Sequence, residues 1–366
     1  MTELKEICKV QCGFAFDSKK FTEDDSFSPL IRIRDVKRGF TQTYYTGEFS
    51  FEYIVHKGDL LVGMDGEFNI ARWNSDDALL NQRVCRIIAN NNVNEEYLRF
   101  YLKRTLKLIE SKTSFVTVKH LSTKQLNGLR INLPCMEDQQ RISKQLSTLE
   151  LMIQKNKKVL ELLDELVKAR FVEMFGDPIE NQKDWEVVKI RDIVTDVRYG
   201  TSKPAVEGGR YPYLRMNNLT VDGGLDLSDL KYIDIPDNEI EKCVVRKGDI
   251  LFNRTNSIDL IGKIAVYNLL DDMVIAGYII RIRLNNQILP DVFSQYMNLE
   301  AMKKVLRGMA KGAVNQANIN AQELQSIKVY IPNMELQKQY VEFKEEIDKS
   351  RLLSNHSLFL IKSITF

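Results

Sequence analysis

The chain has 366 residues, of which 44% are hydrophobic and 28% charged, a composition typical of folded globular proteins rather than disordered ones. No apolar run approaches the roughly 20 residues that a membrane span needs, and the N-terminus lacks the layout of a signal peptide. Five scattered cysteines argue against a secreted disulfide scaffold, so we expect a cytoplasmic protein. With a net charge of only +2, binding to nucleic acid would require basic residues concentrated on one surface.

The first 135 or so residues predict short strands separated by Gly, Asn and Asp turns, and the same pattern of strands and turns is predicted after residue 178. The pairs Gly58-Asp59 and Gly248-Asp249 fit tight turns that lead into apolar strands, because glycine tolerates positive φ. The strands that we expect include 28–36, 60–64, 83–88, 246–252 and 274–284.

A long helix is predicted to follow the first strand-rich region. Residues 137–175 contain neither Pro nor Gly, and their apolar residues alternate four- and three-residue steps, which is typical of a coiled-coil seam. Asn156 and Arg170 occupy seam positions, and Gly176 and Pro178 end the helix. A second helix is predicted from near Glu335. Its seam contains Tyr340, Phe343, Ile347, Leu358 and Ile361.

The two halves repeat each other in sequence, in the same order and with an offset that drifts from 183 to 198 residues. Lys-Gly-Asp-Leu-Leu at 57–61 returns as Lys-Gly-Asp-Ile-Leu at 247–251, and Leu-Ile-Arg-Ile-Arg at 30–34 aligns with Tyr-Leu-Arg-Met-Asn at 213–217. The segment 125–134 likewise matches 323–332. We infer a duplication.

These patterns predict an α+β fold with two pseudo-symmetric strand-rich domains, each followed by a long helix. If a two-fold relates the halves, the two helices pack as an antiparallel coiled coil that separates the domains. The expected boundaries are 1–135 and 179–332 for the domains, and 136–178 and 333–366 for the helices.

The sequence contains no recognisable catalytic motif. The three histidines lie near no nucleophile motif, Cys8 and Cys12 lack a second ligand pair for zinc, and Asp65-Gly66 fits a hairpin turn. There is neither a phosphate-binding glycine loop, nor the Asn-Pro-Pro-aromatic segment of adenine methyltransferases, nor a Pro-Asp…acid-x-Lys nuclease motif. We therefore expect a non-catalytic chain without a metal or cofactor of its own.

The chain resembles the specificity (S) subunits of type I restriction-modification systems over essentially its whole length. The resemblance rests on the Lys-Gly-Asp-Ile-Leu strand entry, on Leu-Pro-Cys-Met-Glu-Asp-Gln-Gln-Arg-Ile at 133–142, and on Phe-Val-Glu-Met-Phe-Gly-Asp at 171–177. The junction from proline to Glu/Gln-Gln is clear at Pro134 and departs from the pattern after Pro332, where Leu336 replaces an acidic residue.

The resemblance implies that each strand-rich domain is a target-recognition domain that reads one half of a split, asymmetric site in double-stranded DNA. The helices would set the spacing and dock two methyltransferase subunits. Those partners would bind S-adenosylmethionine and flip an adenine out of the duplex for N6 methylation. Restriction (R) subunits with motor and nuclease activity would complete the larger complex.

Sequence reading also requires side chains that bond to base edges, among cations that neutralise phosphates. By this criterion the first domain offers Lys19, Lys20, Arg32, Arg34, Lys37, Arg38, Tyr44, Lys112 and Lys119. The second offers Thr201, Ser202, Lys203, Arg215, Asn217, Arg254, Asn256, Lys311 and Asn315. In the repeat, Ser18–Lys20 and 201–203 fall in equivalent loops. Arg32 aligns with Arg215, so both arginines could instead be framework residues that pair with a carboxylate.

Three other interpretations remain open at this point. One is a two-headed adaptor that binds proteins instead of DNA, although the Lys-, Arg- and Asn-rich loops argue against it. Another is an enzyme with an unrecognised site, which a pocket of perturbed titrating groups would reveal. The third is the DNA-reading subunit of a related methylation-based defence system.

Overall fold

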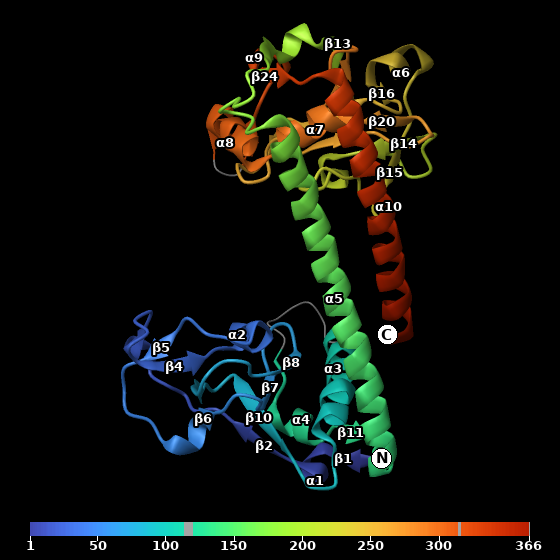
Figure 1. Ribbon diagram of the computed structural model, residues 1–366. Coiled ribbons are helices and arrows are strands. Elements are labelled where there is room, and N and C mark those ends of the chain that lie inside the picture. The colour runs from blue at the N-terminus through green and yellow to red at the C-terminus, as the bar shows by residue number, and fades with distance from the viewer. Residues whose placement is uncertain (113–119, 314–315, 366) are drawn as a thin grey trace. The chain divides into compact units, whose positions relative to one another are not determined.

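The computed structural model describes residues 1–112, 120–313 and 316–365. The chain divides into two compact units, one made of Met1–Lys155 with Leu358–Phe366 and the other of Asn156–Ser357. Figure 1 shows both units and labels many of their elements. We call residues 1–135 the first head and residues 179–332 the second head. In the described part of the chain, no helix combines the length and apolarity needed to cross a membrane.

The first head is built on two sheets. One is antiparallel and has the strand order β2 (Cys8–Cys12), β10 (Val84–Ala89), β7 (Leu60–Gly63), β8 (Asn69–Arg72). The other has the order β3 (Phe21–Thr22), β5 (Tyr44–Tyr45), β4 (Ser28–Ile31), β9 (Ala78–Leu80), β6 (Ile54–Val55), with β4 and β9 parallel. Its helices are α1 (Leu4–Ile7), α2 (Ile33–Arg38), α3 (Glu95–Lys112) and α4 (Thr123–Asn127), and β1 (Thr2–Glu3) pairs with β11 (Arg130–Ile131).

The second head repeats this plan. Its antiparallel sheet has the order β13 (Val194–Tyr199), β21 (Ile279–Leu284), β17 (Ile250–Asn253), β19 (Ile264–Val266). Its second sheet has the order β15 (Lys231–Ile233), β14 (Tyr211–Leu214), β20 (Met273–Ile275), β16 (Val244–Val245), again with a central parallel pair, β14 and β20. In addition, β12 (Glu186–Lys189) pairs with β24 (Lys328–Ile331). A third, three-stranded sheet has the order β18 (Thr255–Asn256), β23 (Gln316–Asn318), β22 (Lys311–Ala313). The helices of this head are α6 (Asp237–Cys243), α7 (Pro290–Asn298), α8 (Glu300–Met309) and α9 (Ala321–Ser326).

Matched turns confirm that the sequence repeat is a structural one. Gly58 and Gly248 both have positive φ, 99° and 93°, so both turns need a residue without a side chain. The Gly58 N–H donates to the Trp73 carbonyl at 2.8 Å, and the Gly248 N–H donates to the Tyr267 carbonyl at 2.9 Å. The predicted Gly-Asp turns are confirmed in both halves.

Three of the expected strands were wrong in extent. The strand predicted at 28–36 ends at Ile31, because the Asp35 carboxylate accepts the Arg32 N–H at 2.9 Å and starts helix α2. The segment 274–284 is two strands, β20 and β21, separated by a turn at Gly277 and Tyr278. The strand expected at 246–252 begins only at Ile250, after the turn at Gly248.

The two predicted long helices are confirmed as α5 (Met136–Phe175) and α10 (Met334–Thr365). Within the second unit they run antiparallel, since Phe171 packs on Tyr340, Asp164 pairs with Arg351, and the Asn156 amide lies 3.4 Å from the Ser357 hydroxyl. Arg170 lies over the Phe343 ring at 5.8 Å. Both polar residues expected at the seam therefore face the partner helix.

The end of α5 is part of the second head's core. Val167, Phe171 and Phe175 are buried in one cluster with strand residues such as Ile250 and Phe252. Full burial of such side chains contributes roughly 1.5–3 kcal/mol each. This packing attaches the second head firmly to α5.

Two cysteines of the first head form a disulfide. Cys12 and Cys85 are directly opposite on β2 and β10, with their Cα atoms 4.1 Å apart, and are joined by a disulfide. Cys8, Cys135 and Cys243 are free.

Candidate nucleic-acid interface

A groove of about 520 Å³ on the second head collects most of the residues that the sequence suggested for DNA binding there. It is formed by the loop after β13, the loop after β14, the residue that follows β17 and the turn between β20 and β21. Its lining includes Thr201, Ser202, Lys203, Tyr213, Arg215, Asn217, Arg254 and Tyr278.

The 201–203 loop is held tightly against the sheet. Gly200 approaches strand β20 so closely that a Cβ atom there would lie 2.1 Å from the Ile275 carbonyl oxygen. The hydroxyl of Tyr213 donates to the carbonyls of Thr201 and Lys203, at 3.2 and 3.1 Å. Burial raises the pKa of Tyr213, so this donor keeps its proton. The backbone of the loop is therefore fixed, while the Ser202 side chain remains exposed.

Arg254 is a positioned guanidinium at one wall of the groove. Its Nε donates to the Gly277 carbonyl at 2.9 Å, its Nη1 donates to the Asn318 side chain at 2.7 Å, and its guanidinium lies over the Tyr199 ring at 5.0 Å. Its Nη2 has no partner in the described part of the chain. This nitrogen can donate to a phosphate or a base acceptor without rearrangement.

Arg215 and Asn217 flank the same wall but behave differently. Arg215 is half-buried and its Nη2 donates to the Asp229 carboxylate at 2.8 Å, which is the framework role left open for it. Hydrogen bonds from Lys231 and Arg215 lower the pKa of Asp229, so the carboxylate stays charged. Asn217 is exposed, and among the described residues its amide has no partner. An amide in this state suits bidentate bonding to an adenine edge.

The other residues expected in the second head lie outside this groove or are already paired. Lys203 lines the groove and pairs with Glu239 at 2.9 Å, whereas Lys311 pairs with Glu323 at 2.5 Å. The Asn256 side chain accepts the Ser257 N–H and does not line the groove. Asn315 lies outside the described residues.

The residues expected in the first head are more dispersed. Lys19 and Lys20 are exposed on a single 3-10 turn, Arg32 and Arg38 are exposed, and Tyr44 belongs to β5. The Arg34 Nη2 donates to Thr43 at 3.2 Å, and Lys37 pairs with Glu67 at 3.0 Å. Lys112 is exposed at the end of α3, and Lys119 lies outside the described residues.

Sequence analysis missed Tyr278 in the second head. Tyr278 lines the groove directly after Gly277 and is 51% exposed. The residue was placed inside a strand because 274–284 is almost continuously apolar, and only the Gly277 before it hinted at the turn.

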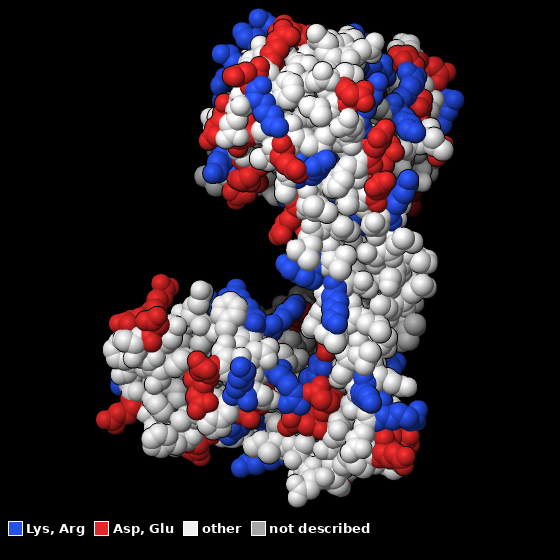
Figure 2. Space-filling model, in the orientation of Figure 1, with Lys and Arg blue, Asp and Glu red and all other residues white. Residues whose placement is uncertain are grey.

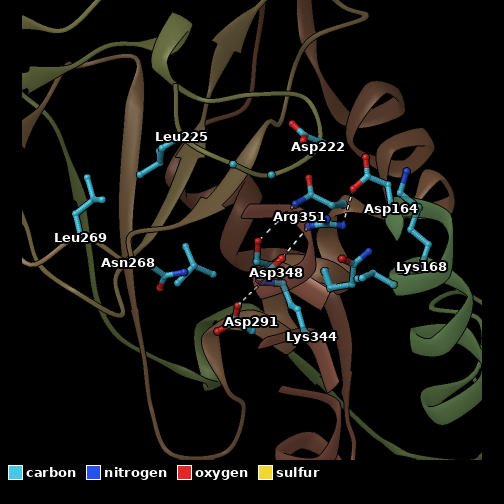
Figure 3. Close-up of a pocket in the computed structure, with 17 residues that line it drawn as sticks. Asp164, Lys168, Asp222, Leu225, Asn268, Leu269, Asp291, Lys344, Asp348 and Arg351 are labelled. Atoms are coloured by element: carbon cyan, nitrogen blue, oxygen red, sulfur yellow. Dashed lines mark hydrogen bonds and ion pairs between the residues drawn. The ribbon is translucent and has the colours of Figure 1, made fainter. Parts of the chain in front are cut away.

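A separate pocket of about 270 Å³ lies in the second unit between the second head and the long helices (Figure 3). Its polar lining is an alternating chain of charges. Lys344 bridges Asp291 and Asp348 at 3.0 and 2.9 Å, and Arg351 bridges Asp348 and Asp164 at 2.9 and 2.5 Å. These ion pairs join α7 of the second head and helix α5 to helix α10, and they therefore hold the second head on the two long helices.

The first unit has an equivalent ionic cluster. Glu150 on α5 accepts hydrogen bonds from Arg99 and Lys103 of α3, both at 2.7 Å, and Arg99 also pairs with Glu96. Glu150 and Asp348 occupy the same position in the repeat. In Figure 2, lysines and arginines are interspersed with acidic residues over both heads, whereas uncharged surface predominates over the long helices. The described residues contain no cluster of potential metal ligands.

Comparison with known proteins agrees with this architecture. The family model of the type I restriction modification DNA specificity domain matches residues 1–165 and 182–360. The specificity subunit of the type I restriction enzyme EcoBI from Escherichia coli is 29% identical over 396 residues, which cover 99% of this chain and 82% of that protein.

Two solved structures share the fold at low sequence identity. The crystal structure of the type I restriction-modification S subunit from M. genitalium gives a TM-score of 0.58 at 14% identity, covering 100% of this chain and 93% of that one. A chain from work on complex assembly and conformational transition of the type I R-M system gives 0.54 at 18% identity, covering 100% and 94%. The chain therefore belongs to the family of DNA specificity subunits of type I restriction-modification systems.

Proposed function

We propose that this chain reads a bipartite, asymmetric target in double-stranded DNA, one half with each head, and directs adenine-N6 methyltransferase and restriction subunits to it. The observation that carries the proposal is the pairing of one repeated scaffold with two different sets of exposed side chains. The matched sheets and turns give both heads the same framework, whereas Asn217 and its aligned partner Arg34 offer different hydrogen-bonding groups. A split asymmetric site requires this combination.

In the second head, the proposed contacts divide into two kinds. Asn217 and Ser202 are exposed and contact base edges, because neither side chain is committed to another residue in the described part of the chain. Arg254 and Lys203, with the exposed Lys311 nearby in the β22 strand, neutralise phosphates and set the register on the duplex.

The helices supply the docking surface for the methyltransferase subunits, two of them in the proposed complex. Besides the seam that faces α10, α5 carries a second stripe at heptad spacing, formed in the second unit by Val159, Leu162 and Leu166. These side chains are 41, 49 and 45% exposed. Spacing of this kind suits another helix. The partner, not this chain, would bind S-adenosylmethionine and carry out the transfer.

The test is genome-wide detection of N6-methyladenine in a host that carries the partner methyltransferase, with and without this chain. The proposal expects a split motif, methylated in both halves, only when the chain is present. An expressed, soluble methyltransferase whose methylation pattern is the same in both hosts would overturn the proposal.

A further inference from the structure

The strand register identifies first-head counterparts of residues in and beside the second-head groove, at positions that the sequence did not select for DNA binding. The Thr201 N–H donates to the Ile275 carbonyl, and the Phe14 N–H donates to the Leu80 carbonyl at the equivalent place in the first head. Gly13 approaches β9 as Gly200 approaches β20, since a Cβ on Gly13 would lie 2.3 Å from the Leu80 carbonyl oxygen. Phe14, not Ser18, therefore stands where Thr201 stands.

The same reasoning extends to the opposite wall of the groove. The Arg254 N–H donates to the Tyr278 carbonyl and its carbonyl accepts from Ile319. The Met64 N–H donates to the Arg83 carbonyl and its carbonyl accepts from Leu121. Thr255 is directly opposite Asn318 in a bridge, as Asp65 is opposite His120. In the first head, Asp65, Arg83 and His120 thus occupy the positions of Thr255, Tyr278 and Asn318.

Asp65, Arg83 and His120 form a cluster in which the carboxylate is largely buried and the other two side chains are exposed. His120 Nδ1 lies 2.5 Å from one oxygen of Asp65, and Arg83 Nε lies 3.2 Å from the other. The Asp65 side chain is only 22% exposed, whereas those of Arg83 and His120 are 52 and 46% exposed. Asp65 thus orients two outward-facing groups.

The outer edge of the cluster offers hydrogen-bond donors. With Nε directed at Asp65, the two terminal nitrogens of Arg83 have no partner within the described residues. His120 Nδ1 faces the Asp65 carboxylate, which leaves Nε2 as the ring nitrogen without a partner in the described part of the chain. This nitrogen accepts a hydrogen bond when Nδ1 carries the only ring proton, and donates one when both nitrogens are protonated. Guanine presents two acceptors, N7 and O6, in the major groove, and arginine is the side chain that matches both.

We propose that Asp65, Arg83 and His120 form the base-reading cluster of the first head, with Arg83 selecting guanine and Asp65 as the residue that positions it. The inference rests on the proposed function, because it assumes that the heads read DNA. It replaces the dispersed first-head lysines as readers and leaves them to contact phosphates. The second head places Thr255, Tyr278 and Asn318 at these positions, so the two half-sites differ in chemistry.

The experiment compares methylation motifs of the intact methyltransferase complex carrying the wild-type chain, Arg83→Ala, Arg83→Lys or His120→Ala. We expect Arg83→Ala to relax one guanine position in a single half-site by about tenfold or more, while the other half-site is unchanged. Arg83→Lys should restore part of the preference. The matched control for His120 is His56→Ala, since the His56 Nδ1 lies 2.8 Å from exposed Asp77 elsewhere in the same head. Arg141→Ala, an exposed arginine paired with Asp138 on α5, is the control for Arg83.

The outcomes separate this inference from the proposed function. If wild type gives a split motif and the Arg83 and His120 variants leave both half-sites unchanged, the cluster does not read bases although the proposed function stands. If wild type gives no motif, the proposed function itself fails. If either control variant relaxes the same position as Arg83→Ala, the effect does not come from the cluster and the assignment is overturned. Unaltered thermal unfolding of the Arg83 variants excludes a folding defect as the cause.

Discussion

Gln139 and Gln337, 198 positions apart, are buried at the start of the two long helices and share two matching hydrogen bonds. The Nε2 of each donates to the carbonyl of the proline five residues before it, at 2.9 Å. The Oε1 of each accepts a backbone N–H from the segment that leads into α3 or α7, from Asn94 or from Leu289, at 2.8 Å. The proline-to-glutamine junction is therefore the joint between head and helix, and a repeated joint explains the repeated motif.

Replacing either glutamine should loosen one head. Gln139→Ala or Gln337→Ala leaves buried donors and acceptors unpaired, so we expect a loss of about 1–3 kcal/mol in the free energy of unfolding. The thermal unfolding midpoint of the full chain measures the loss. Gln322→Ala, at an exposed glutamine of α9 whose side chain is not hydrogen-bonded to another described residue, should change stability by no more than about 0.5 kcal/mol. Equal effects at Gln322 and Gln337 would contradict the role of the joint.

The hydroxyl of Tyr340 is buried without a hydrogen-bond partner among the described residues, although its ring packs edge-on against Phe171 at 5.4 Å. Tyr340→Phe keeps the ring contacts and removes the unpaired group, so it should raise the free energy of unfolding by about 1 kcal/mol. Tyr330→Phe is the matched control, because the buried Tyr330 hydroxyl donates to the Gly176 carbonyl at 2.9 Å. That variant should be destabilised. Denaturant unfolding that ranks the two variants in the opposite order would refute this explanation.

Lys303 makes the stability of the second head depend on pH. Burial lowers its pKa from 10.5 to about 8, while its Nζ donates to the Gly262 carbonyl at 2.6 Å. Between these two pKa values the unfolded chain binds more protons than the folded one, so the free energy of unfolding rises with pH across this window. Below about pH 8 both states are protonated and the cost of burying the charge is fully present.

Lys303→Met removes this dependence. From about pH 7 to about pH 10, we expect wild type to gain roughly 1–3 kcal/mol relative to the variant. The exposed neighbour gives the control, Lys304→Met, for which the difference should stay constant. A wild-type advantage that stays flat or shrinks as pH rises would contradict the assignment.

The exposed stripe on α5 gives a prediction for assembly. Leu162→Glu places a charge in the centre of the stripe Val159, Leu162 and Leu166, so binding of the methyltransferase subunit should weaken by about tenfold or more. Lys157→Glu changes the charge of an exposed residue on the opposite side of the helix and should leave binding intact. Co-purification and titration of the subunit measure both. Equal binding by Leu162→Glu and wild type would place the docking surface elsewhere.

For the second-head groove, Asn217 is the sharpest test residue. Asn217→Ala should relax one base position in one half-site and leave thermal stability unchanged, because the amide makes no hydrogen bond to the rest of the described chain. Asn238→Ala, at an exposed asparagine of α6 outside the groove, is the control. The methylation motif of the complex carrying each variant measures both results. A motif that keeps every position in Asn217→Ala removes this residue from the reading set.

Much of the architecture could be predicted from the sequence because duplication and helical periodicity are properties of the pattern itself. The Lys-Gly-Asp turns, the seam of α5 and the matching seam of α10 were all visible as spacings. The end of β4 was not, because it depends on the Asp35 side chain reaching back to the Arg32 N–H. The alternation of apolar residues cannot predict a hydrogen bond between a side chain and the backbone such as this one.

The site was predicted unevenly for a related reason. Thr201, Lys203, Arg215, Asn217 and Arg254 stood out by residue type, and the structure brings all five to one groove. Tyr278 was hidden in an apolar run. In the first head, Asp65, Arg83 and His120 come from three separate segments. Only the pairing of strands shows that they meet, because no local sequence motif joins them.

The exchange of residues 1–135 for the corresponding head of another family member tests the central claim most directly, with the methylation motif of the assembled complex as the readout. The account predicts that one half of the split motif changes to that of the donor, while the other half and its methylated adenine stay as in wild type. A folded, assembled chimaera that changes both halves, or neither, would contradict the assignment of one half-site to each head.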